Sequence, residues 1–308
     1  MTDVDPALQG LTLLERGWLS SNNVLLHGGG RGAVLVDSSH VLHAEQTVAL
    51  VRRALQGEPL RRVVNTHLHS DHCGGNVALQ RAFGCRLTIP PGQWQAVQDW
   101  DEGALSYAAT GQRCERFVPD DRLAPGDVLA VGDRQWRALA APGHDPHSLI
   151  LFDAEHRVVI TADALWERGF GVVFPELEGE SGYDDVARTL DLIESLQARW
   201  AIPGHGRPFS NVSAALAVAR QRLAGFRADP NRHAHHAMKA LIKYHLLEVR
   251  QQPLPELLAW FDAGPLYRET WRRAGRPAGS MHAYGARIVS ELAADGVLAL
   301  RDGVVTND

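Results

Sequence analysis

A stretch of twelve residues in the first third of the chain is unusually rich in side chains that bind metals. Residues 65–76 read Asn-Thr-His-Leu-His-Ser-Asp-His-Cys-Gly-Gly-Asn. An extended or turning backbone sends His67 and His69 to the same side, and a tighter turn offers Asp71 and His72 as a second pair. Imidazole and carboxylate groups together suit a divalent ion such as Zn²⁺, Fe²⁺ or Mn²⁺. A polar loop that binds nothing is the alternative, but this spacing after a short apolar strand favours a metal site.

Three later loops repeat this arrangement. Short apolar strands are predicted to run into the loops at 142–148, 162–163 and 203–206, and each loop carries a histidine or an aspartate. Loops at one end of a sheet, drawn from distant parts of a chain, are where enzymes assemble their sites. The four loops supply seven candidate metal ligands, which are His67, His69, Asp71, His72, His144, Asp163 and His205.

In these loops the chain resembles the metallo-β-lactamase superfamily. The matching stretches are Thr-His-Leu-His-Ser-Asp-His, Pro-Gly-His, the later aspartate and Pro-Gly-His-Gly, which follow the family's order within residues 11–210. The resemblance implies an α/β fold, the four-layer αβ/βα sandwich of that family. It also implies one ion held by His67, His69 and His144, a second ion held by Asp71, His72 and His205, and Asp163 bridging the two.

The resemblance further implies hydrolysis by two divalent ions, with zinc favoured over iron or manganese. The ions would share a bridging hydroxide, because metals lower the pKa of bound water to about 7. Asp71 would also accept a proton from the attacking water. The hydrolytic relatives, glyoxalase II above all, imply a small ester, thioester or lactone as the substrate, with a phosphodiesterase or endoribonuclease as the alternative. Asp163 argues against a true β-lactamase, which generally lacks this aspartate, and the complete ligand set argues against a non-catalytic module.

Substrate contacts are expected in the segment after Asp163. Aromatic residues stand among glycines there, which is typical of a mobile apolar pocket wall, although a strand and turn packed on the core would look the same. Trp166, Arg168 and Phe170 are therefore candidate contacts. His147 is a further candidate. It could contact substrate at the rim of the site or donate a hydrogen bond to one of the metal-binding residues, and the alternative is a structural or solvent-facing histidine.

The last part of the chain is predicted to be a small, mainly helical domain. A boundary at Asp229-Pro230-Asn231 divides the chain into a catalytic domain, residues 1–228, and a C-terminal domain, residues 229–308. The C-terminal domain resembles a winged-helix domain, because a hairpin across Asp302-Gly303 follows three predicted helices. These helices are expected at 233–250, 254–261 and 280–294.

Charge in the C-terminal domain gives weak support to nucleic acid as a partner. Residues 232–308 hold ten Arg or Lys against eight Asp or Glu, whereas a dedicated nucleic-acid reader has a stronger basic stripe. Nucleic acid is therefore possible but not favoured. We expect a domain that closes over the active site or forms a homodimer, and a small-molecule substrate. The one local basic patch suits a solvated face or a contact to an anionic substrate, and consists of Arg268, Arg272, Arg273 and Arg276.

Composition indicates an ordinary cytoplasmic protein. The 308 residues are 45% hydrophobic and carry a net charge of −5, which gives no electrostatic case for an anionic membrane. The first ten residues lack the features of a secretory signal, and no apolar run is long enough to span a membrane.

Three cysteines without CxxC spacing fit a reducing compartment, and we expect them to be buried side chains rather than metal ligands. The histidines at 233, 235 and 236 are expected on a polar helix surface.

Overall fold

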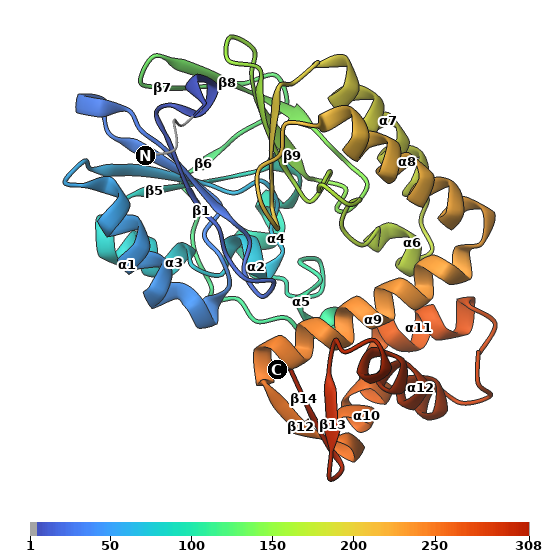
Figure 1. Ribbon diagram of the computed structural model, residues 1–308. Helices are drawn as coiled ribbons and strands as arrows, with labels where there is room; N and C mark the ends of the chain where they lie inside the picture. Colours follow the sequence, from blue (N-terminus) through green and yellow to red (C-terminus); the bar gives the residue numbers. More distant parts are fainter. Residues whose placement is uncertain (1–4, 308) are drawn as a thin grey trace.

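Two β-sheets form the centre of the computed structural model, which describes residues 5–307 (Figure 1). The first sheet has six strands in the order β1-β2-β3-β4-β5-β6. Its pairs are antiparallel from β1 to β3 and parallel from β3 to β6. These strands span Leu11–Leu14, Asn23–Leu26, Ala33–Val36, Leu60–Val64, Arg86–Ile89 and Asp121–Arg122.

The second sheet has five strands in the order β11-β10-β9-β8-β7. The pair of β10 and β11 is parallel, whereas the other pairs are antiparallel. A crossover containing helices joins β10 to β11, as parallel neighbours require. The strands span Val128–Val131 for β7, Arg134–Ala140 for β8, Leu149–Asp153 for β9, Val158–Ala162 for β10 and Trp200–Pro203 for β11.

Both faces of each sheet are covered, which explains the apolar runs in the central strands. Along β3, Val34 and Val36 belong to the core between the sheets, and Leu35 belongs to the core under the first pair of helices. Trp136 of β8 is fully buried between the sheets. The alternation follows from the two-residue repeat of a strand.

Helices cover the outer face of each sheet, as Figure 1 shows. The apolar side of α1, with Val48 and Val51, packs on the first sheet beside α3. Leu190 of α7 and Leu216 of α8 pack on the second sheet. The predicted four-layer sandwich is therefore confirmed. These four helices span Ala44–Leu55 for α1, Asn76–Phe83 for α3, Tyr183–Ser195 for α7 and Val212–Ala228 for α8.

Shorter helices lie in the connections. The metal-binding stretch contains α2, and the connection between β5 and β6 contains α4 and α5. The loop after β10 contains α6. They span Ser70–Cys73 for α2, Trp94–Asp99 for α4, Tyr107–Thr110 for α5 and Phe174–Glu178 for α6, with 3-10 turns at Pro6–Leu8, Gly29–Arg31, Val41–His43 and Pro91–Gln93.

The C-terminal region holds four helices and a small sheet of order β12-β14-β13. Figure 1 places α9 between the two-sheet body and the rest of this region. The predicted hairpin is present as β13 and β14, but α11 was not predicted; its buried side chains include Leu266 and Tyr267. The likeness to a winged helix stays a prediction. The elements span Pro230–Val249 for α9, Leu254–Ala263 for α10, Pro265–Arg273 for α11, Met281–Ala294 for α12, Gln251–Pro253 for β12, Ala299–Arg301 for β13 and Val304–Thr306 for β14.

Hydropathy bears on the expectation about membranes. Within residues 5–307, none of the helices combines the length and the apolar character needed to cross a bilayer. The twenty residues of α9 are long enough, but polar and charged side chains interrupt them throughout.

Candidate metal centre

The loops that follow β4, β8, β10 and β11 meet at one edge of the sandwich. All seven candidate ligands lie on these loops, and the structure brings them together in two groups whose ligand atoms lie within 4.8 Å of one another. Every member is buried. The first group is His67, His69 and His144, and the second is Asp71, His72, Asp163 and His205.

In the first group, three imidazole nitrogens converge on one point. Nε2 of His67 lies 3.1 Å from Nδ1 of His69, which in turn lies 2.8 Å from Nε2 of His144. Nitrogens bound to one tetrahedral ion at about 2.0–2.1 Å would stand roughly 3.3 Å apart. The three side chains therefore fit a divalent ion.

The second group mixes imidazole and carboxylate. Oδ2 of Asp71 lies 3.1 Å from Nε2 of His205 and 3.8 Å from Nε2 of His72. Nε2 of His72 is buried, and it has no hydrogen-bond partner among residues 5–307. A buried polar nitrogen without a partner is costly unless an ion or another ligand satisfies it. This group therefore also fits a divalent ion.

Asp163 lies between the two groups. Its Oδ2 is 3.4 Å from Nε2 of His144 in the first group and 3.5 Å from Nε2 of His72 in the second. Nε1 of Trp166 donates a hydrogen bond to its other oxygen, Oδ1, at 3.1 Å. Gly204 permits this position, because a Cβ there would lie 2.2 Å from Oδ1 of Asp163.

Neighbouring polar groups orient the candidate ligands. Nδ1 of His72 donates to Oδ2 of Asp37 at 2.7 Å, and the hydroxyl and amide of Thr66 donate to the same carboxylate. Nδ1 of His144 donates to the carbonyl of Val172 at 2.6 Å, which turns Nε2 toward the site. Such partners fix the tautomer and ring orientation of metal-binding histidines. The role of Asp37 could not be predicted from the sequence, because a lone aspartate at the end of a strand carries no distinguishing pattern.

The histidines of the site differ in the direction in which their surroundings shift the pKa. Burial, followed by the neighbouring histidines, lowers the pKa of His67 well below its usual value, and the pKa of His69 falls to about 4. Burial opposes the charged form of His72 too, but Asp37, Asp163 and Asp71 together raise its pKa well above the usual value. His67 and His69 are thus already in the neutral form that binds metals.

The carboxylates of the site are held ionised. Burial alone would raise the pKa of Asp71, but His72 and His205 lower it to about 2. His205 and His72 likewise hold the pKa of Asp163 well below its usual value, against the effect of burial. Both carboxylates are therefore ionised at neutral pH, as metal ligands must be.

A cavity of about 480 Å³ opens onto the centre, and its walls come from both parts of the chain. Trp18, from the connection between β1 and β2, stacks on His205 with the ring centroids 5.3 Å apart. Helix α9 contributes Leu241, Tyr244 and Leu247 to the wall. Sequence patterns gave no reason to assign Trp18 or the α9 residues to the site, since only the tertiary fold brings them there.

The four candidate substrate contacts separate in the structure. Trp166 and Arg168 line the cavity. Phe170 does not, because its side chain is 2% exposed and packs in the core against Phe226, so we no longer assign it to substrate. His147 is also absent from the lining; it lies against Gly92, where a Cβ would come within 2.1 Å of its ring. The alternative of a structural histidine therefore describes its position better.

The prediction of a polar surface for the histidines of α9 was wrong for His233. That side chain is 1% exposed, and its Nε2 accepts a hydrogen bond from the amide of Val173 at 3.1 Å. His236 is half-buried and lines the cavity. His235 pairs with Glu291 at 2.7 Å.

The prediction for the cysteines holds better, since two of the three are buried and none joins a ligand group among residues 5–307.

A match to a sequence profile identifies the family of this chain. The profile of the metallo-beta-lactamase superfamily matches residues 16–205, which include all seven candidate ligands. The chain belongs to this superfamily. It is a hydrolase similar to glyoxalase II, as its relatives indicate.

Two curated relatives and one solved structure illustrate the similarity. A hydroxyacylglutathione hydrolase of Bradyrhizobium sp. (strain ORS 278) is 30% identical over 244 residues, which cover 78% of this chain and 80% of that protein. The acyl-coenzyme A thioesterase MBLAC2 of Gallus gallus is 28% identical over 158 residues, which cover 47% of this chain and 56% of that protein. A metallo-beta-lactamase family protein of Thermus thermophilus superposes with a TM-score of 0.55 at 20% identity, over 97% of this chain and 99% of that one, and so shares the fold.

Proposed function

We propose that this chain hydrolyses small thioesters with two divalent ions, for which zinc is our first choice. His67, His69 and His144 would hold one ion, and Asp71, His72 and His205 the other. Asp163 would contact both. The observation that carries the proposal is the position of Asp163, whose Oδ2 lies within 3.5 Å of histidine nitrogens from both groups. Iron or manganese would suit the same ligands.

Two bound divalent ions would supply a nucleophile at neutral pH, by lowering the pKa of water to about 7, and would stabilise negative charge on the carbonyl oxygen. The residues of the chain would do the rest. Asp71 is ionised and adjoins the cavity, so that its carboxylate can accept a proton from the attacking water. Nε2 of His205 lies 3.1 Å from Oδ2 of Asp71, a separation that lets both atoms hold the same ion. The rings of Trp18 and Trp166 pack against the ring of His205, with centroid distances of 5.3 and 5.5 Å.

The choice of thioesters among the possible substrates is supported by the relatives and by the cavity. The two relatives described above are named as a hydroxyacylglutathione hydrolase and an acyl-coenzyme A thioesterase. Val172, Phe174 and Leu241 give the cavity an apolar side that suits an acyl chain. The ring of Phe174 lies beside the rings of His69 and His144, so an acyl chain packed on it would place its carbonyl at the ions.

A parallel activity screen on metal-loaded protein tests the proposal. It sets thioesters and lactones beside a bis-aryl phosphodiester and a short single-stranded RNA, and measures the same substrates with Asp71→Ala. Asp191→Ala is the control, because Asp191 lies on the outer helix α7 and pairs with Arg220, away from the metal centre. We expect thioester turnover that Asp71→Ala abolishes and Asp191→Ala keeps. Cleavage of RNA or the phosphodiester alone would replace our proposal with the endoribonuclease alternative.

A further inference from the structure

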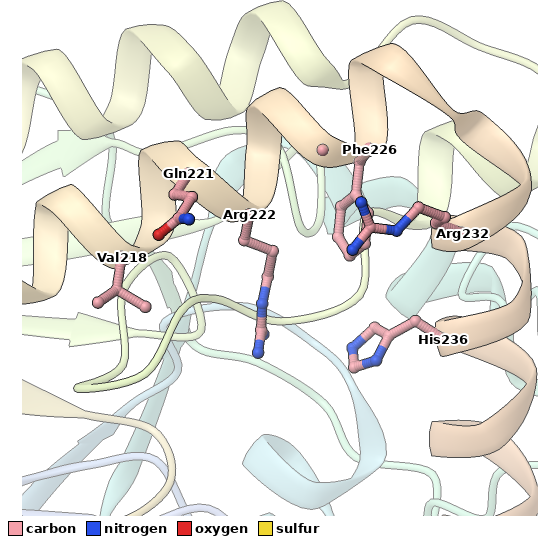
Figure 2. Close-up of a pocket in the computed structure, with 7 residues that line it drawn as sticks. Val218, Gln221, Arg222, Phe226, Arg232 and His236 are labelled. Atoms are coloured by element: carbon pink, nitrogen blue, oxygen red, sulfur yellow. The ribbon is translucent and has the colours of Figure 1, made fainter.

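A second cavity of about 470 Å³ lies between α8 and α9. It shares Arg222 and His236 with the cavity of the metal centre, so the two spaces adjoin. Figure 2 shows Arg222 extending from α8 and His236 extending from α9 toward the same space. The residues that line it are Val218, Gln221, Arg222, Gly225, Phe226, Arg232 and His236.

The positive charge in this second cavity is not balanced by the protein. Arg222 is half-buried, and within residues 5–307 its guanidinium has neither an ion pair nor a hydrogen bond. Burial lowers the pKa of Arg222, but a guanidinium keeps its proton at neutral pH. Among the described residues, no carboxylate lines this cavity. A half-buried charge without a partner favours the binding of an anion.

Other arginines of the same helix differ from Arg222. On the outer side of α8, Arg220 pairs with Asp191 at 2.7 Å and with Glu194 at 2.8 Å. Arg227 pairs with Asp184. The helix therefore neutralises the arginines that face α7 and leaves the one that faces the cavity unpaired within the described part of the chain. This difference indicates a site for a ligand rather than a generally basic surface.

Two further side chains complete the set of donors. Arg232 has no carboxylate partner among residues 5–307, and Figure 2 shows its guanidinium beside Phe226 at the edge of the cavity. Burial, followed by the charge of Arg222, lowers the pKa of His236 to about 4. His236 is thus neutral at pH 7 and can donate one ring N–H. The guanidinium groups of Arg222 and Arg232, together with the imidazole N–H of His236, suit the oxygens of phosphate or carboxylate groups.

The combined size of the two cavities points to a long substrate. The cavity at the metal centre, at about 480 Å³, is already large enough for a ligand of moderate size. A small acyl thioester would not need an adjoining space of similar volume. That space would accommodate the thiol half of a longer molecule whose reacting carbon lies at the ions.

We propose that the cavity between α8 and α9 is a subsite for the anionic end of the thiol half of a thioester, bound by Arg222, Arg232 and His236. This inference rests on the proposed function. The anionic groups are phosphates, as in coenzyme A, or carboxylates, as in glutathione. The subsite would hold the thiol half after the acyl–sulfur bond is cleaved, and would therefore select the leaving group rather than the acyl group.

Binding and kinetics on metal-loaded protein test the subsite together. Calorimetry with desulfo-coenzyme A and with S-methylglutathione, neither of which has a free thiol to reach the ions, measures binding without turnover. Arg222→Gln and Arg232→Gln each remove one charged donor, and the exposed position of Arg232 protects its variant from folding defects. We expect at least one probe to bind, with affinity reduced on the order of tenfold in each variant. The probe that binds identifies the anion.

Kinetics with one acyl group on three thiols separate the subsite from the chemistry. Arg222→Gln should raise KM for the coenzyme A or glutathione thioester and leave kcat nearly unchanged. The uncharged N-acetylcysteamine thioester should be hydrolysed equally by the variant and the wild type. Arg220→Gln, on the same helix but paired outside the cavity, is the matched control and should leave KM unchanged.

The two proposals fail in different ways. If neither probe binds, or if binding is unaffected in both variants, the subsite is wrong even where thioesters are hydrolysed. An equal loss for the charged and the N-acetylcysteamine thioesters would also overturn it. If no thioester is hydrolysed, the proposed function fails, and binding of a probe that depends on Arg222 would still establish the anion subsite.

Discussion

The hydroxyl oxygens of Tyr244 and Ser70 lie 2.9 Å apart, and this contact joins α9 to the stretch of candidate ligands. Ser70 stands between His69 and Asp71 in sequence. Tyr244 also lines the cavity at the metal centre. The C-terminal region therefore supports the metal-binding stretch directly, in addition to forming one wall of the cavity.

Replacing Tyr244 by phenylalanine tests this support. Tyr244→Phe removes the hydroxyl but keeps the ring, so we expect the free energy of unfolding to fall by about 0.5–1.5 kcal/mol, the usual value of one hydrogen bond. Metal content should stay the same, because no candidate ligand is altered. Denaturant unfolding and elemental analysis measure the two quantities. An unchanged unfolding free energy would show that the contact contributes nothing to stability.

Trp166 offers a test of ligand orientation. Trp166→Phe keeps an aromatic wall but removes the hydrogen bond to Oδ1 of Asp163. Loss of such an orienting bond typically weakens metal binding or activity roughly 10–100-fold. Competition with a chelator measures the affinity. Trp18→Phe is the control, since Trp18 stacks on His205 without bonding to a carboxylate of the site. The metal affinity of this variant should change much less.

Asp163 itself should be essential for holding metal. We expect Asp163→Ala to lose most of the metal from one or both groups, because the side chain lies beside histidine nitrogens of each. Elemental analysis of the purified variant, beside the wild type prepared in the same way, measures the stoichiometry. Nearly unchanged metal content in Asp163→Ala would refute the assignment of this residue as a shared ligand.

His233 predicts a dependence of stability on pH. Burial, followed by repulsion from His236, lowers its pKa in the folded protein to about 3. The pKa in the unfolded chain is about 6.5, so the unfolded state binds more protons below that pH. Stability from this group is therefore complete above about pH 6.5 and is lost as the pH falls toward 3, with on the order of 2 kcal/mol lost by about pH 5.

Urea unfolding at neutral and acidic pH measures this dependence. His233→Gln keeps an acceptor for the amide of Val173 but cannot titrate. The variant should lose less stability than the wild type between the two pH values. The metal ligands are common to both proteins, so their own titration cancels in the comparison. Equal losses in both proteins would show that His233 is not the titrating group.

Much of the fold and of the metal centre could be predicted because the signals are local. A strand that ends in a loop with His or Asp is visible within about ten residues, and the four such loops contain every member of the two groups. The core positions of α1 and α7 also follow the helical repeat. In contrast, α11 could not be predicted. It begins at Pro265 after Gly264, and it has few apolar residues among its arginines, so the helical repeat is too short to recognise.

The walls of the cavity could not be predicted, since contacts between distant segments decide them. Trp166 and Phe170 stand four residues apart in the same aromatic segment, yet only Trp166 faces the cavity, and Phe170 fills the core. His233 and His236 share a helix, yet one is buried against Val173 and the other faces both cavities. Residue type alone does not distinguish these positions.

The spread of the ligands along the chain sets the time at which the protein can acquire metal. During synthesis, the first group becomes complete when His144 emerges, whereas the second must wait for His205. A nascent chain stalled before β11 would hold at most one complete group. Loading of both groups would thus require β11 to be in place in the second sheet.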